Sequence, residues 1–243
     1  KKIKKSESWI RDKTGVSSRF FVNRKRGETS SYLAYHSSLR AIKHAKIKKE
    51  KINYIISCNY TGDYIFPCLA SKVAKMLNIN CGVFDLSANC SGFQLALSAA
   101  DGLFHSDKNN SIILLIGTAV QSSFINWNSP ENSMYFGDGS GAILLKRVNK
   151  KKYGIIAHET FTDPTAYEDV RLVGGGSNLP ANLYSNKNKN NYLYDMSGIE
   201  TWKQVVTNQP RNILNVLNKS KKTMKEINYF IFHQANKNLI LFL

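Results

Sequence analysis

The sequence predicts an α/β fold, because short apolar segments of strand length alternate with longer segments of helical periodicity. Strand-like runs lie at residues 83–86 and 112–118, and stretches with helical spacing lie at residues 67–77 and 90–105. This alternation is typical of βαβ units, in which helices cover a mainly parallel sheet.

An internal repeat is the second observation that supports this class. Residues 51–57 read Lys-Ile-Asn-Tyr-Ile-Ile-Ser, and residues 226–232 read Glu-Ile-Asn-Tyr-Phe-Ile-Phe. Each copy follows an amphipathic helical stretch, at 31–45 and at 198–217, and then a lysine-rich turn. Pro210 is expected to kink or interrupt the second helix, because proline lacks the amide hydrogen that a helix needs. The repeat predicts a duplicated chain.

We expect the halves of this duplication to be residues 1–150 and residues 151–243. Far less sequence follows the second copy of the repeat than the first, so the second half is expected to be incomplete. A chain of 243 residues, 42% of them hydrophobic, is long enough to bury a substantial core.

The cysteines and the apolar runs indicate a cytoplasmic protein without membrane insertion. None of the four cysteines forms a CxxC pair, so we expect neither a zinc site nor a disulfide scaffold, and a reducing compartment fits best. The longest purely apolar run, residues 112–116, is too short to cross a bilayer, and the lysine-rich start lacks the apolar stretch of a signal peptide. We expect no bound metal and no permanently bound cofactor.

The net charge of +17 could indicate a nucleic-acid surface, an acidic protein partner or phosphate-bearing substrates. Most lysines lie at the ends of predicted elements, where they form solvated faces. The cluster of Arg19, Arg24, Lys25 and Arg26 is compact enough for a phosphate site, and a solvated loop is the alternative. Nucleic-acid binding has only the net charge in its favour, because no RNA-binding motif is present.

The segment that spans residues 84–100 places Cys90 between an apolar strand-like run and an apolar helical one, and Ser91 and Gly92 permit a sharp turn. A thiol at a helix N-terminus lies close to unpaired amide groups and the positive end of the helix dipole, which favour the thiolate. The pattern therefore predicts a nucleophile with a lowered pKa. A buried structural cysteine is the alternative.

His233 directly follows a second apolar run, residues 229–232, which is predicted to be a strand. A cysteine with a distant histidine is the arrangement expected of a nucleophile and its partner. The glycine-rich run at 136–141 is predicted to be a tight turn that feeds a strand at 142–146. It is not a P-loop, because no lysine-serine or lysine-threonine pair follows the glycines.

The motifs of this chain resemble those of the beta-ketoacyl-[acyl-carrier-protein] synthase III family of thiolase-like condensing enzymes. The resemblance covers nearly the whole chain, and the chain looks truncated at both ends. It rests on Ser8-Trp9-Ile10 with Lys13-Thr14-Gly15, Asp63-Tyr64-Ile65-Phe66-Pro67, Ala88-Asn89-Cys90-Ser91-Gly92-Phe93, Phe136-Gly137-Asp138-Gly139-Ser140-Gly141-Ala142, Met196-Ser197-Gly198 and His233-Gln234-Ala235-Asn236. It implies a thiolase-like fold, with two duplicated halves in a layered α-β-α-β-α arrangement.

The resemblance also implies the reaction and the residues that perform it. Cys90 matches the cysteine that takes an acyl group from acyl-CoA. His233 matches the histidine that stabilises the enolate formed from malonyl-acyl-carrier-protein. The condensation gives a 3-oxoacyl-acyl-carrier-protein, in the initiation of fatty acid synthesis or a related pathway. Trp9 matches a tryptophan that stacks on the CoA adenine, and Lys13 stands where the family has an arginine on the other face. Phe66 matches an aromatic that reaches across a homodimer interface and limits the acyl pocket.

Two other functions remain open. The chain could transfer an acyl group from Cys90 to an alcohol or amine of specialised metabolism without decarboxylation, with His233 as a general base. It could also be a non-catalytic truncated paralogue that binds a partner. The family's second donor to the malonyl carbonyl, an asparagine of a Gly-Asn motif, lies beyond the matched region, and Asn236 is not expected to replace it. Core packing beside Pro67 is the alternative for Phe66.

Overall fold

The computed structural model describes residues 3–148 and 153–243. Segments that pack together form two compact units, and each is described by itself. The boundary predicted at 150/151 concerns the duplication of the sequence and stays a prediction. Unit 1 consists of Lys1–Arg19, Ser122–Phe136 and Ile156–Leu243, and unit 2 consists of Phe20–Gln121 and Gly137–Ile155.

Unit 2 is built on a four-stranded sheet whose strand order is β2-β1-β3-β4. β1 (Tyr54–Cys58) pairs in parallel with β2 (Gly82–Leu86) on one side and with β3 (Ile112–Val120) on the other. β4 (Asp138–Lys146) pairs antiparallel with β3 and forms one edge. The strands expected at 83–86 and 112–118 are therefore confirmed, as is the α/β class.

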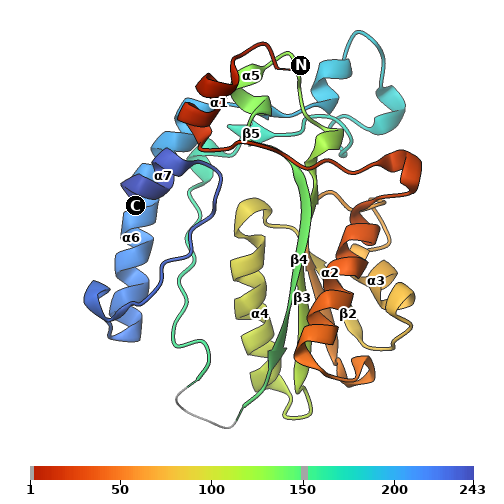
Figure 1. The fold of residues 1–243 in the computed structure, drawn as a ribbon, viewed down its shortest axis with the longest axis vertical. Helices are drawn as coiled ribbons and strands as arrows, with labels where there is room; N and C mark the ends of the chain where they lie inside the picture. The colour runs from red at the N-terminus through yellow and green to blue at the C-terminus, as the bar shows by residue number, and fades with distance from the viewer. Residues whose placement is uncertain (1–2, 149–152) are drawn as a thin grey trace. The chain divides into compact units, whose positions relative to one another are not determined.

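Helices cover both faces of this sheet, because its central strands are apolar on both sides (Figure 1). Ile55 packs with α2 (Ser30–Ala45) and α3 (Leu69–Leu77), while the next residue, Ile56, packs with α4 (Gly92–Ser106). The same alternation runs along β3. The core between the sheet and α2 and α3 includes Ala34, Leu69, Val73, Leu77, Ile112, Leu114 and Ile116. The core between the sheet and α4 includes Ala96, Ala100, Ile113 and Leu115.

The regular secondary structure of unit 1 is mainly helical. It contains α1 (Glu7–Thr14), α5 (Pro130–Ser133), α6 (Gly198–Ser220) and α7 (Lys237–Phe242), and the short antiparallel pair β5 (Val170–Arg171) and β6 (Asp195–Met196). None of the helices among the described residues is long and apolar enough to span a membrane.

Short 3-10 helices occur in both units: η1 Arg24–Arg26, η2 Lys49–Lys51, η3 Asn89–Ser91, η4 Gln121–Ser123, η5 Pro164–Ala166, η6 Ala181–Leu183, η7 Lys189–Tyr192 and η8 Met224–Glu226.

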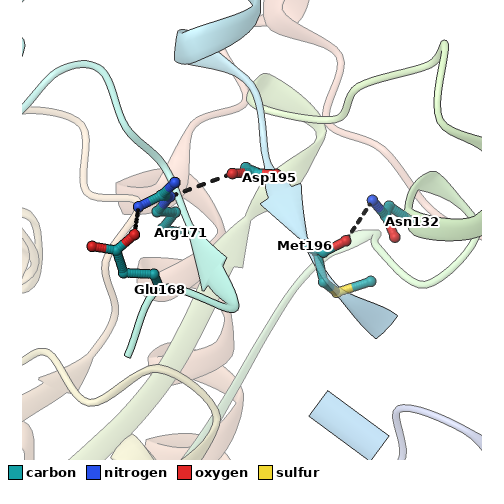
Figure 2. A network of polar contacts seen from close by, with 5 residues as sticks. All are labelled: Asn132, Glu168, Arg171, Asp195 and Met196. Atoms are coloured by element: carbon teal, nitrogen blue, oxygen red, sulfur yellow. Dashed lines mark hydrogen bonds and ion pairs between the residues drawn. The ribbon is translucent and has the colours of Figure 1, made fainter. Parts of the chain in front are cut away.

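Polar contacts tie β5 and β6 to their neighbours in unit 1 (Figure 2). The Arg171 guanidinium lies between Glu168 and Asp195, with 3.3 Å from its Nε to Asp195 Oδ2. Met196 follows Asp195 in β6, and its carbonyl accepts a hydrogen bond from Asn132 Nδ2 at 3.0 Å. These contacts fix the start of α6, which begins two residues after β6 ends.

The internal repeat is visible in the backbone. α2 ends at the left-handed residue Lys46 (φ 52°), and η2 begins three residues later. α6 ends in the same way at Lys221 (φ 55°), and η8 also begins three residues later. The predicted duplication therefore holds for the helix end, the turn and the 3-10 helix of both copies.

The strand predicted at residues 229–232 is wrong. Its counterpart in the first copy, β1, has a parallel partner on each side, whereas this segment pairs with no strand among the described residues. Tyr229 and Ile231 are 86% and 88% exposed. A strand depends on hydrogen bonds to a neighbour, so an apolar pattern alone does not produce one.

Two smaller predictions are corrected. α6 continues through Pro210 without interruption, because the long amphipathic helix outweighs the loss of one backbone hydrogen bond. Gly139 and Gly141 lie within β4 rather than in a turn, since their backbones pair with Ala119 and Gly117 of β3.

Candidate active site

Cys90 lies on a tight turn that connects β2 to α4 at the carboxyl end of the parallel strands. The turn is the 3-10 helix η3, so Cys90 precedes the first residue of α4, Gly92, rather than starting the helix as the sequence predicted. Asn89, directly before the cysteine, adopts φ 46°, which is the left-handed region. Asparagine tolerates this region better than most residues. Ligands of open α/β sheets bind at this edge, so the position suits a nucleophile.

Gly92 lets this turn lie close to β1. A Cβ added to Gly92 would lie 3.4 Å from the Cβ of Cys58, the last residue of β1. Ser91, the N-cap residue of α4, makes no side-chain hydrogen bond to the helix. The first amides of α4 therefore have no side-chain cap from this residue and face the region of Cys90.

The Cys90 residue is exposed, yet the surrounding protein desolvates its thiol. Burial raises the pKa of the Cys90 thiol, and the backbone hydrogen bond at Cys90, which lowers it, is the smaller effect. The predicted lowering of this pKa is thus wrong in direction, because the loss of hydration outweighs the backbone hydrogen bond. Cys90 is mainly a thiol at neutral pH.

Phe66 lies in the loop between β1 and α3, residues 60–68, and its side chain points away from the core. Tyr64, Ile65 and Phe66 are all exposed, Phe66 to 83%. The Phe66–Pro67 peptide bond is cis. Packing in the core of unit 2 is therefore not the role of Phe66, and a contact outside this unit remains the prediction.

His233 lies in an irregular segment of unit 1 between η8 and α7. The residue is exposed, and desolvation by burial lowers the pKa of its imidazole. The ring is therefore neutral near pH 7, and a neutral imidazole can donate one hydrogen bond to an oxyanion.

Asn236, three residues later, is the N-cap of α7. Its side chain accepts a hydrogen bond of 2.8 Å from the amide of Asn238. Its side-chain bond with Tyr135 lowers the pKa of that phenol, although burial is the larger effect and raises it. These bonds give Asn236 a structural role at the start of α7.

Trp9 and Lys13 lie one turn apart on α1, on the same side of the helix. The cation over the Trp9 ring is that of Lys5, whose Nζ lies 4.9 Å from the ring centroid, and sequence reasoning missed this residue. α1 packs against α7 at Gly15, whose backbone has φ 78°. A Cβ at Gly15 would lie 2.6 Å from the Cβ of Lys237.

Unit 1 thus carries Trp9, Lys13 and His233, and unit 2 carries Cys90 and Phe66. Within unit 1, the packing of α1 on α7 brings the Trp9 helix next to the helix that follows His233.

The basic cluster predicted around Arg19 is divided between the units. Arg19 is held in unit 1 by two hydrogen bonds to the Tyr135 carbonyl, of 3.2 and 3.0 Å, and the three basic residues of η1 are exposed in unit 2.

A hollow of about 490 Å³ in unit 1 contains none of the predicted site residues. Trp127, Tyr184, Tyr192 and Lys189 contribute to its lining. In the described ranges, no three histidine, cysteine, aspartate or glutamate side chains are grouped to hold a metal ion.

Comparisons with known proteins agree with the fold. The family model of 3-oxoacyl-[acyl-carrier-protein (ACP)] synthase III matches residues 84–164. The beta-ketoacyl-[acyl-carrier-protein] synthase III of Rickettsia rickettsii (strain Sheila Smith) is 33% identical over 238 residues, which are 97% of this chain and 70% of that protein. The enzyme of the same name from Campylobacter fetus subsp. fetus is 35% identical over 242 residues, 99% of this chain and 72% of that protein.

A solved structure gives the same assignment. The beta-ketoacyl-[acyl carrier protein] synthase III of Thermus thermophilus superposes with a TM-score of 0.87 at 27% identity, over 99% of this chain and 72% of that one. The thiolase-like fold is therefore confirmed. This protein belongs to the beta-ketoacyl-[acyl-carrier-protein] synthase III family, whose members are acyltransferases.

Proposed function

We propose that this chain condenses an acyl-CoA primer with malonyl-acyl-carrier-protein to give a 3-oxoacyl-acyl-carrier-protein, and that Cys90 and His233 are its catalytic residues. The observation that carries the proposal is the position of Cys90, exposed on a tight turn at the carboxyl end of β2 and directly before α4. The match of the family model over residues 84–164 includes this turn.

In the first half-reaction, the sulfur of Cys90 attacks the thioester carbonyl of the acyl-CoA. The thiol proton leaves and protonates the departing CoA sulfur, and an acyl thioester forms on Cys90. Because burial raises the pKa of this thiol, the proton has to be removed as the substrate binds rather than beforehand. The backbone amides at the start of α4 are suited to stabilise the oxyanion that forms.

In the second half-reaction, the carbon-carbon bond to the malonyl carboxylate breaks and carbon dioxide leaves. The electron pair passes into an enolate, whose carbon attacks the acyl carbonyl on Cys90, and the Cys90 thiolate is released. His233 suits the role of hydrogen-bond donor to the enolate oxygen, because its lowered pKa keeps the imidazole neutral.

The remaining assignments concern substrates and partners. Trp9, with Lys5 over its ring and Lys13 one turn away, offers an aromatic face with nearby cations for the adenine and phosphates of CoA. The net charge of +17 suits an acidic carrier protein. Four free cysteines fit the reducing cytoplasm, in which we place the protein.

We also propose a homodimer. Two features of unit 2 could contact a second copy: the exposed aromatic loop around Phe66 and the outer edge of β2, which pairs with a strand on one side only within the described residues. Size-exclusion chromatography with light scattering is expected to give a molar mass twice the 27.4 kDa of one chain. Phe66→Asp is expected to shift the equilibrium towards the monomer, and Tyr167→Asp, at another exposed aromatic residue, is the control.

Intact-protein mass spectrometry after incubation with short acyl-CoAs tests the nucleophile. One acyl mass is expected on the parent chain and none on Cys90→Ala, while Cys68→Ala is the matched control and keeps the acyl group. Addition of malonyl-acyl-carrier-protein should then release a 3-oxoacyl product and free Cys90. An acyl mass that persists on Cys90→Ala rules out this nucleophile, and transfer to an alcohol or amine without carbon dioxide release favours the acyltransferase alternative.

A further inference from the structure

The carbonyl groups at the end of α1 are satisfied from two sources. The amide of Gly15 closes the helix by donating to the carbonyl of Arg11 at 2.7 Å. The next two carbonyls, those of Asp12 and Lys13, accept from Nδ2 of Asn238 at 3.4 and 3.5 Å. The last carbonyls of a helix have no partner within the helix itself. A side chain of α7 therefore supplies part of the C-terminal cap of α1, and both helices belong to unit 1.

Asn238 is itself held at the start of α7. Its backbone amide donates to Oδ1 of Asn236, the N-cap residue, at 2.8 Å. The carbonyl of Asn236 accepts from the amide of Ile240 at 3.2 Å, which begins the helix. The place of the Asn238 side chain thus follows from the backbone of the His233 segment, which leads directly into α7.

The two helices also approach closely beside this cap. The side-chain stem of Lys237 lies over Gly15, so a Cβ added to Gly15 would lie 2.6 Å from Lys237 Cβ and 3.1 Å from its Cδ. Asn238 follows Lys237 in the chain, and its reach to the carbonyls of α1 depends on this close approach.

α1 has few other anchors in the core. It is eight residues long, Thr14 at its end is its buried residue, and Trp9 and Ile10 are half-buried. A helix this short is marginal by itself, and tertiary contacts have to hold it. The buried residue, the close approach and the cap by Asn238 all lie at the C-terminal end, so this end sets the position of the helix that carries Trp9.

We infer that Asn238 is a positioning residue that fixes α1 against α7 and thereby places the face of Trp9 that receives the nucleotide part of acyl-CoA. The inference rests on the proposed function for the role of Trp9. Asn238 acts through α1 rather than on the thioester. Its loss should therefore weaken reactions of substrates that carry the nucleotide and spare those of substrates that lack it.

Two acetyl thioesters separate these cases. Acetyl-CoA carries the nucleotide, whereas S-acetylpantetheine presents the same acetyl group on the same arm without it. For acylation of Cys90, we expect Asn238→Ala to lower the ratio of kcat/KM for acetyl-CoA to that for S-acetylpantetheine by about threefold or more, the effect of one net hydrogen bond. The change should be a higher KM for acetyl-CoA with kcat unchanged, because only binding is weakened.

Three variants accompany this measurement. Trp9→Ala should lower the same ratio at least as far, since it removes the aromatic face itself. Asn186→Ala, at an exposed asparagine of unit 1, is the matched control and should leave the ratio unchanged. Asn238→Asp keeps the size of the side chain but lacks the NH₂ donor, so it decides by the same ratio if Asn238→Ala does not fold. An unchanged ratio, or an equal loss with both thioesters, would overturn the inference.

Hydrogen exchange provides a second readout that needs no thioester. In Asn238→Ala, peptides that cover residues 9–16 and 234–242 should exchange faster, while those of residues 201–215 in α6 stay protected. Faster exchange throughout unit 1 would show a general loss of stability and overturn the inference. If Trp9→Ala leaves the ratio of the parent chain unchanged, the proposed nucleotide site fails, and the exchange data still decide whether Asn238 fixes α1.

Discussion

The four cysteines should differ strongly in their reaction with iodoacetamide, and Cys58 should be the slowest. Cys58 is 8% exposed at the end of β1, and burial together with the charge of Asp85 raises its pKa to about 11. Cys90 is exposed, and burial of its thiol also raises its pKa. Only the thiolate reacts, so the pH dependence of alkylation reports each pKa.

The magnitude follows from the thiolate fractions. At pH 8, a thiol with a pKa of about 11 is ionised to roughly 0.1%, whereas an unperturbed thiol with a pKa of about 8.5 is ionised to roughly a quarter. Ionisation alone thus slows Cys58 by about 200-fold, and its burial slows it further. For Cys90, the rate should still be rising above pH 8.5, about the value of a free cysteine.

The assay is timed alkylation between pH 6.5 and 10.5, followed by peptide mass spectrometry that separates the four sites. Asp85→Asn should accelerate alkylation of Cys58 at a given pH, because a charge that raises its pKa has been removed. A midpoint for Cys90 below about pH 8 would refute the conclusion that desolvation outweighs the backbone hydrogen bond at this turn. Alkylation of Cys58 as fast as that of Cys90 would refute the burial argument.

Three further changes test the fold and the site. Gly15→Ala should lower the free energy of unfolding in urea by about 2–3 kcal/mol, because it combines a positive φ with a Cβ 2.6 Å from that of Lys237. Gly27→Ala is the control, since Gly27 has φ 73° but no atom close to the added Cβ, and it should lower this free energy by only about 1 kcal/mol. Equal losses in the two variants would contradict the packing of α1 on α7. Pro210→Ala should raise the free energy of unfolding by about 1–3 kcal/mol, since it restores a backbone amide hydrogen inside α6. No increase would mean that this amide finds no carbonyl acceptor. His233→Ala should leave acylation of Cys90 unchanged and slow condensation by about 10²–10³-fold, as measured by mass spectrometry of reactions quenched at set times. An equal loss of rate in both steps would contradict a role of His233 limited to donating a hydrogen bond to the enolate.

Local patterns explain how much of the fold could be predicted from the sequence. The helices at 31–45 and 198–217 and the turns that follow them depend on neighbours in sequence, and both copies of the repeat form the same backbone up to η2 and η8. The strand at 229–232 needs a partner from elsewhere in space, so the same residue pattern produced β1 in one copy and an exposed irregular segment in the other.

The candidate site was predictable to the same extent. The Cys90 turn and the His233 segment could be found because their residue types stand next to apolar runs. The direction of the Cys90 pKa could not, because desolvation depends on every group that surrounds the thiol. Asn238 was missed for a related reason: the carbonyls that it reaches are distant in sequence, and an asparagine inside a helix carries no local signal of a second helix that it caps.

The left-handed conformation of Asn89 has a consequence for how reactivity arises in this chain. A residue with φ 46° costs free energy that a short peptide would avoid by relaxing to another conformation. In the folded chain, β2 on one side and α4 on the other hold the residue in place, so the packed sheet supplies the energy that keeps the turn bent. The bent conformation of the Cys90 turn therefore depends on the pairing of β2 with β1, several residues away from the cysteine itself.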